Sequence, residues 1–132
     1  MSEPVLSAPA SAAPLPEPLP DTLADTIRID AAQPLFAGHF PGAPILPGVM
    51  QLAFAQRLLD RLDGGPWRLR RVGRCKFAAP VVPGMTVSAR LVPLRLRDEG
   101  WLELRYELRD ADANGNAGDT VLVRAELSAA RA

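Results

Sequence analysis

The feature that most constrains the fold is the strict alternation of side chains between Trp101 and Arg109. Leucine or tyrosine occupies every even position, and glutamate or arginine occupies the odd positions between and after them. Successive side chains of a β-strand point to opposite faces, so this pattern predicts a strand with one buried and one exposed face. The predicted inward residues are Leu102, Leu104, Tyr106 and Leu108.

Looser alternation predicts further strands around this one. Strands are expected at Trp67–Phe77, where the even positions are mostly charged, at Thr86–Leu96, and around Thr26–Asp30. The stretch Asp110–Asp119 contains Asn-Gly and is expected to form a hairpin loop. A last strand follows it, with the predicted inward residues Val121, Val123, Ala125 and Leu127.

One helical pattern precedes the strands. Apolar residues recur with helical spacing over residues 48–63, and Gly64-Gly65-Pro66 provides a stop. The apolar arc is wide, so the helix is expected to be largely buried. One buried helix followed by long antiparallel strands predicts an α+β fold, in which an antiparallel sheet wraps around one long central helix.

The chain divides into a tail and one domain. Residues 1–20 contain six of the fourteen prolines, which disfavour both helix and sheet, so this segment is expected to be a flexible tail. Residues 21–132 are expected to form a single domain with one modest core.

Composition argues against several classes of function. A formal net charge of zero disfavours nucleic acid as the main partner. A single cysteine excludes an intrachain disulfide, and one cysteine with one histidine argues against a zinc site. Cys75 is expected to be an inert buried thiol. No apolar run has the length of a membrane span, and the N-terminus does not resemble a secretory signal, so a cytoplasmic protein is expected.

The stretch Gly38–Leu52 holds the only histidine, His39, among three prolines and three glycines. Proline fixes φ and glycine permits unusual backbone, so the loop is expected to have one shape and to end at the predicted helix start. Such a loop could present an imidazole for proton chemistry. The residue types alone are equally compatible with an ordinary turn.

Two motifs resemble the hotdog-fold 3-hydroxyacyl-[acyl-carrier-protein] dehydratases. The first is Gly38-His39-Phe40-Pro41-Gly42, followed by Pro44 and by Pro47-Gly48-Val49, and it is similar to the active-site signature of that family. The second is Lys76-Phe77 followed by Pro80-Val81-Val82-Pro83-Gly84. The resemblance extends roughly over residues 20–128, and it implies a hotdog domain with its active site at a dimer interface.

The resemblance implies that water is removed from a 3-hydroxyacyl thioester to give the trans-2-enoyl thioester. His39 would take the C2 proton as the base, with its ring oriented by the backbone carbonyl of Ile45. The N–H of Gly48 would stabilise the negative charge that develops on the thioester oxygen. The residues expected to contact the substrate are Phe40, Ile45, Val49, Gln51, Ala53 and Phe77.

The sequence departs from the family at one catalytic position. Where family members carry an acidic residue on the helix, fourteen positions after the histidine, this chain has Ala53, which cannot donate a proton. Three hypotheses follow. Gln51 or Gln56 could orient the hydroxyl through water, a partner chain could supply the acid, or the protein could bind acyl chains without turnover.

The resemblance also implies partners. Family substrates are carried on the phosphopantetheine arm of acyl carrier protein, so no further cofactor and no metal are expected. Carrier proteins are acidic, and a basic face is expected to bind one, although a solvated face is equally compatible; its members are Arg68, Arg70, Arg74 and Lys76. A homodimer, or a heterodimer with another hotdog subunit, is expected because pairing covers open sheet edges.

The preferred hypothesis is a dehydratase of fatty-acid-like or aryl-polyene pigment biosynthesis, because dehydratase-like proteins of aryl-polyene clusters resemble this chain from loop to helix. Two other classes stay open at this point. One is a catalytically silent acyl-binding or scaffold subunit of a heteromeric dehydratase. The other is a hotdog thioesterase or an enoyl hydratase, which would also lack the acid at Ala53.

Overall fold

The computed structural model describes residues 19–30, 46–97 and 100–132. In chain order its elements are β1 (Leu23–Arg28), α1 (Gly48–Leu59), β2 (Trp67–Phe77), β3 (Thr86–Arg97), β4 (Trp101–Ala111) and β5 (Ala117–Arg131). The tail predicted over residues 1–20 lies almost wholly outside the described residues, as do His39, Phe40 and Ile45 of the predicted site.

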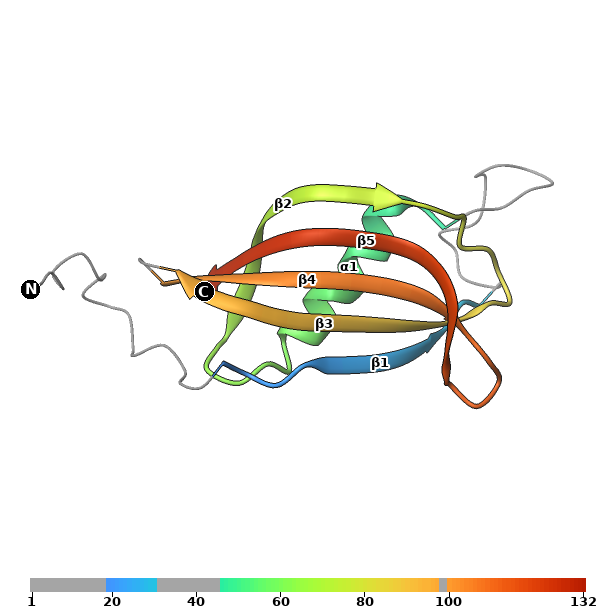
Figure 1. The fold of residues 1–132 in the computed structure, drawn as a ribbon, viewed down its shortest axis with the longest axis horizontal. Helices are drawn as coiled ribbons and strands as arrows, with labels where there is room; N and C mark the ends of the chain where they lie inside the picture. The colour runs from blue at the N-terminus through green and yellow to red at the C-terminus, as the bar shows by residue number, and fades with distance from the viewer. Residues whose placement is uncertain (1–18, 31–45, 98–99) are drawn as a thin grey trace, which may run out of the picture.

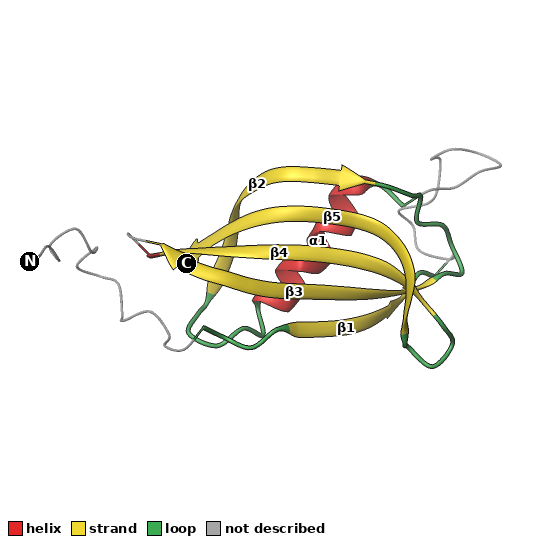
Figure 2. Cartoon of the chain, viewed as in Figure 1, coloured by secondary structure: helices red, strands yellow, loops and turns green. Residues whose placement is uncertain are grey.

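The strands form one antiparallel sheet in the order β1-β3-β4-β5-β2, and α1 lies across one face of it (Figures 1 and 2). The three central strands β3, β4 and β5 follow one another in the chain, whereas β1 and β2 occupy opposite edges. The connection that contains α1 therefore crosses from one edge of the sheet to the other. This arrangement confirms the predicted sheet curved around a single helix.

The inner face of the sheet carries the core. Leu102, Leu104, Tyr106 and Leu108 of β4 are all buried, as the alternation predicts. On β5 the buried residues are Leu122, Val123, Ala125, Leu127 and Ala129. Val121 is only half-buried, contrary to the prediction, because a bulge pairs Leu108 with Val123 but Arg109 with Val121.

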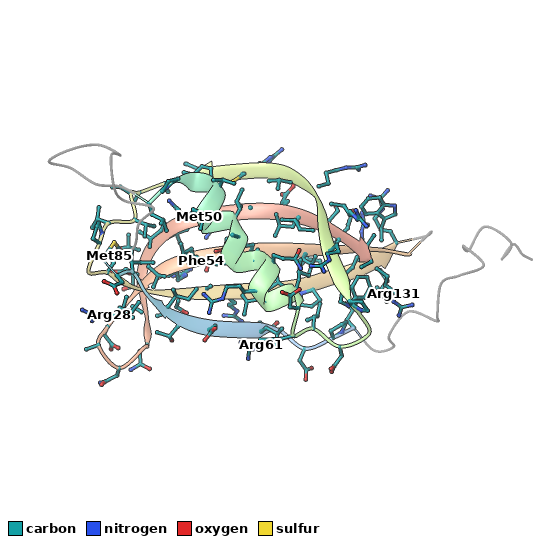
Figure 3. The ribbon with its side chains drawn as sticks, turned by 180° about the vertical axis from the view of Figure 1, so that it is seen from behind. Arg28, Met50, Phe54, Arg61, Met85 and Arg131 are labelled. Atoms are coloured by element: carbon teal, nitrogen blue, oxygen red, sulfur yellow. The ribbon has the colours of Figure 1, made fainter. Side chains whose placement is uncertain are left out.

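The helix is shorter and less buried than predicted. It ends at Leu59, four residues before the expected end, and its buried residues are Gln51, Ala55, Leu58 and Leu59. Val49, Ala53 and Arg57 are exposed, and their spacing of four residues places them on one stripe that faces away from the sheet. Burial is partial because a single sheet covers only one side of α1. Met50 and Phe54 are half-buried against the core (Figure 3).

The edge strand β2 departs from simple alternation. Its register with β5 shifts between Leu69 and Arg71 and again between Val72 and Cys75, so Arg70 and Arg74 lie in bulges. Val72, Cys75 and Phe77 pair with the buried residues of β5 and therefore share the inner face. The strand therefore alternates only in part, because Val72 at an even position shares the inner face with Cys75 and Phe77 at odd positions.

A buried hydrogen bond ties the helix to the sheet. The Tyr106 hydroxyl of β4 donates to the backbone carbonyl of Gln51 in α1 at 2.7 Å, and the tyrosine is fully buried. Among the described residues, no helix is long and apolar enough to cross a membrane.

Replacing Tyr106 with phenylalanine is expected to lower the free energy of unfolding by about 1 kcal/mol, because it removes this hydrogen bond while keeping the ring in place. Urea denaturation followed by circular dichroism measures the change. A loss well below this value would show that the hydroxyl adds little to the attachment of the helix.

Candidate active site

The N-terminus of α1 presents backbone donors to its surroundings. Gly48 is the first helical residue, and Pro47 before it makes no side-chain capping hydrogen bond. The first backbone N–H groups that bond within this turn are those of Met50 and Gln51, both to the Pro47 carbonyl. The N–H groups of Gly48 and Val49 have no acceptor in the part of the chain that the structure describes. This is the position at which the resemblance implies an N–H donor to the thioester oxygen.

Phe77, from the second motif, lies against Gly48. A Cβ atom built on Gly48 would come within 2.9 Å of Cζ and 3.1 Å of Cε1 of the Phe77 ring. The two motifs therefore meet at the start of the helix. Phe77 is 49% exposed and Val49 is 73% exposed, so two predicted substrate-binding residues offer apolar surface beside the free N–H groups.

The backbone just before the helix is fixed from two sides. The N–H of Leu46 donates to the Val81 carbonyl at 2.7 Å, and the Leu46 carbonyl accepts from Nε2 of Gln51 at 2.9 Å. Val81 belongs to the second motif, so that motif holds the end of the first one in place. Gln51 thus has a positioning contact that sequence reasoning missed.

The oxygen of Gln51 remains available. The residue is only 4% exposed, and Oε1 is buried without a hydrogen-bond partner among the described residues. Buried polar atoms are usually paired, so this acceptor is notable beside the predicted site. Contact of Gln51 with substrate stays a prediction.

Gln56 does not fit the role of orienting the substrate hydroxyl. Its Nε2 donates to Oδ1 of Asp60 at 2.8 Å and to the Trp67 carbonyl at 3.1 Å, and its Oε1 accepts from the N–H of Leu69 at 2.9 Å. Both ends of the amide are engaged in anchoring the start of β2 to α1. These contacts argue against Gln56 as the residue that orients the hydroxyl through water, and that hypothesis stays untested.

Ala53 lies on the exposed stripe of α1, between Val49 and Arg57. The helix has no carboxylate from Gly48 to Leu59, and the next one, Asp60, accepts from Gln56 and lies 3.8 Å from Arg68. Helix α1 therefore has no acid on the stripe that carries Ala53. The stripe that carries Ala53 is open to a second molecule.

The basic residues predicted to bind a carrier all lie on β2. Arg68, Arg70, Arg74 and Lys76 are exposed, and the two bulges leave them off any single regular face. Cys75, on the same strand, is half-buried, and its burial raises the pKa of the thiol above its ordinary value. A thiol with a raised pKa carries little thiolate at neutral pH, which agrees with the expectation that Cys75 is inert.

Replacing Gly48 with alanine is expected to leave the melting temperature almost unchanged, because the half-exposed Phe77 ring can swing away from the new methyl group. The displaced ring and the methyl group would crowd the free N–H, so turnover should fall by up to about 10²-fold. Kinetics on a 3-hydroxyacyl thioester and a thermal melt measure both quantities. A melting temperature that falls together with the rate would instead indicate damage to the fold.

Comparisons with known proteins identify the family of the chain. The model of the ApeI-like family, described as ApeI dehydratase, matches residues 20–117. A 3-hydroxyacyl-[acyl-carrier-protein] dehydratase FabZ of Methylobacterium radiotolerans is 31% identical over 111 residues, which cover 76% of this chain and 65% of the relative. The FabZ of Rhizobium rhizogenes is 35% identical over 80 residues, 55% of this chain and 51% of the relative. The chain thus spans about half to two thirds of these curated relatives.

Solved structures support the fold. The dehydratase heterocomplex ApeI:P from Xenorhabdus doucetiae has a TM-score of 0.62 at 22% identity and covers 88% of this chain and 93% of that chain. The (R)-hydratase of A. caviae involved in PHA biosynthesis has a TM-score of 0.63 at 18% identity, with coverages of 86% and 96%. The fold is the hotdog fold. With a family model matched over most of its length, the chain belongs to the ApeI-like branch of the hotdog 3-hydroxyacyl-[acyl-carrier-protein] dehydratases.

Proposed function

We propose that this chain dehydrates a 3-hydroxyacyl thioester to the trans-2-enoyl thioester. His39 takes the C2 proton, the thioester oxygen becomes negatively charged, and the N–H of Gly48 donates a hydrogen bond to it. The C3–O bond then breaks, and the hydroxyl leaves as water after it receives a proton. The observation that carries the proposal is the open start of α1, where Gly48 lies beneath the Phe77 ring of the second motif.

We further propose that a second hotdog subunit supplies the acid that protonates the leaving hydroxyl. Ala53 lies on the exposed stripe of α1, so a partner that covers this stripe would bring its own helix to the site. The structural relative from Xenorhabdus doucetiae is a dehydratase heterocomplex, and this supports a hotdog partner as the source of the carboxylate. The chain alone would turn over slowly, with water as the proton donor.

The substrate is proposed to arrive on the phosphopantetheine arm of acyl carrier protein, as the names of the FabZ relatives indicate for those proteins. The arm belongs to the substrate, so no resident cofactor is required. We propose fatty-acid-like or aryl-polyene pigment biosynthesis as the pathway and the cytoplasm as the compartment.

Mass spectrometry of a 3-hydroxyacyl-carrier protein, incubated with the purified chain, tests this function. We expect slow loss of one water from the acyl group, and no loss with a His39→Ala variant. Release of the free acid would show a thioesterase instead, and preference for a coenzyme A thioester would show an enoyl hydratase. If the mass of neither aryl nor aliphatic acyl groups changes, the chain is a catalytically silent subunit.

A further inference from the structure

The outer face of the sheet, which Figure 1 views with α1 behind it, is strongly basic. Residues opposite one another in paired strands point to the same face, so the register assigns each paired residue of the five strands to a face. Because the whole chain has a net charge of zero, the excess of cations on this face is local, and it attracts anions. The register places ten cations there, against the three carboxylates Glu103, Glu107 and Glu126: Arg28, Arg68, Arg71, Lys76, Arg90, Arg95, Arg97, Arg105, Arg109 and Arg124.

Two of the three carboxylates are already neutralised. Glu103 accepts from Nε of Arg95 at 2.5 Å and from a terminal nitrogen of Arg97 at 3.0 Å. Glu107 accepts in the same way from two arginines, at 2.6 and 2.9 Å. Glu126 has no ion pair within the described part of the chain. Several cations of this face therefore have no carboxylate to pair with.

A groove of about 300 Å³ crosses four strands of this face. Its shape depends on Gly73, which lies in the second bulge of β2 and has no side chain. A Cβ atom built on Gly73 would lie 3.4 Å from the backbone oxygen of Glu126, which also lines the groove, so a larger side chain would fill part of the space. Leu94, which is 43% exposed, adds an apolar wall.

Two arginines reach the groove from either side of β5. Arg71 comes from β2 and Arg105 from β4, and both of these strands pair with β5. Neighbouring strands lie about 5 Å apart, so β2 and β4 are separated by about 10 Å, a span that two arginine side chains can close. The Arg71 guanidinium lies over the Trp101 ring at 5.2 Å, and neither arginine has an ion pair among the described residues. Both guanidinium groups are therefore free to donate to one anion between them.

We propose that this groove binds a phosphate-bearing molecule, with Arg71 and Arg105 as donors to the phosphate and Leu94 against the apolar part of the ligand. Guanidinium groups match phosphate in geometry and charge, and a dianion gains from two of them. Glu126 lies opposite Arg105 in the paired strands, so its charge opposes the anion and limits the affinity. The groove and α1 lie on opposite faces of the sheet, so this binding is independent of the dehydration proposed above.

Phenyl phosphate and inorganic phosphate are the probes. Titrated into the isotope-labelled chain and followed by nuclear magnetic resonance, phenyl phosphate should shift the amide signal of Gly73 and saturate. Inorganic phosphate should bind about three- to ten-fold more weakly, because it leaves Leu94 uncovered. Equal affinity for the two probes would show a site for free phosphate only and would overturn the assignment of an organic ligand.

Paired substitutions test the two donors. Arg71→Gln with Arg105→Gln should weaken the binding of phenyl phosphate by at least about ten-fold. The matched control, Arg28→Gln with Arg90→Gln, removes the same charge from the same face outside the groove, and it should change the affinity by less than about three-fold. An equal loss in both variants would show diffuse attraction to the whole face and would overturn the proposal.

Two single substitutions guard against misfolding as the cause of lost binding. Glu126→Gln removes the opposing charge and should tighten binding by about three-fold or more, a gain that an unfolded chain cannot produce. Gly73→Val fills the groove without a change of charge and should abolish saturable binding. Weaker binding by Glu126→Gln would contradict the site. So would a DNA duplex that binds the native chain and Gly73→Val equally well while displacing phenyl phosphate, because the face would then be a general surface for polyanions.

Discussion

Replacing His39 with alanine should lower the rate of water loss from a 3-hydroxyacyl-carrier protein by about 10²–10⁴-fold, because no second imidazole exists in the chain to act as the base. The substitution removes proton abstraction at C2 and leaves the N–H of Gly48 in place. The rate should be measured by mass spectrometry of the acyl group under single-turnover conditions, so that binding and product release do not hide the chemical step.

The pH profile distinguishes a base from a structural residue. An imidazole base must be neutral, so the native rate should rise with pH through the range around 6.5 and then level off. The His39→Gln variant is the matched control, since it keeps a polar side chain but cannot titrate in this range. A native profile that is flat through this range, or a His39→Gln variant with native turnover, would contradict the role of His39.

The second large effect is expected from restoring the missing acid in trans. The probe is a variant of this chain that carries His39→Ala and Ala53→Glu, so that it has an acid but no base. Ala53 is exposed, so a longer polar side chain should be tolerated there. Mixed with the native chain, which has a base but no acid, it should raise the rate of water loss by about 10²–10⁴-fold over the native chain alone.

The reversed combination controls for this experiment. Here the probe keeps His39 and carries Ala53→Glu, and the native chain carries His39→Ala. If base and acid act from different subunits, neither site of the mixed dimer is complete, and the gain should disappear. A gain in this reversed mixture, with none in the first, would show that base and acid act within one chain.

The strands were predictable where burial alone decides the pattern. The alternation from Leu102 to Leu108 identifies β4, because both faces of this central strand are set by the core on one side and water on the other. Bulges escaped prediction at Arg70, Arg74 and Leu122, because an extra residue in one strand depends on the partner strand and leaves no local sequence signal. The burial of the helix was overestimated because the sheet covers only one side of α1. The apolar residues Val49 and Ala53 are therefore exposed in the single chain.

The two motifs were recognisable from the sequence, but their meeting, through the contact of Phe77 with Gly48, was found only in the structure. The positioning role of Gln51 could not be predicted from the sequence. Its side-chain N–H donates to the backbone carbonyl of Leu46, five residues earlier, and its backbone carbonyl accepts from the Tyr106 hydroxyl in a distant strand. A polar residue within the apolar arc of a predicted helix was the available signal, since buried amides usually bond to backbone.

The order of strands along the sheet also bears on how the molecule folds. The strands β3, β4 and β5 are neighbours both in the chain and in the sheet, so they can form by local hairpin closure. In contrast, β2 can pair with the sheet only after β5 has formed. The first residue of β5, Ala117, lies forty positions after Phe77, the last residue of β2. Late docking and an open outer side should make the amide hydrogens of β2 exchange with solvent sooner than those of β4. Hydrogen exchange measured residue by residue along β2 and β4 therefore tests this order of folding.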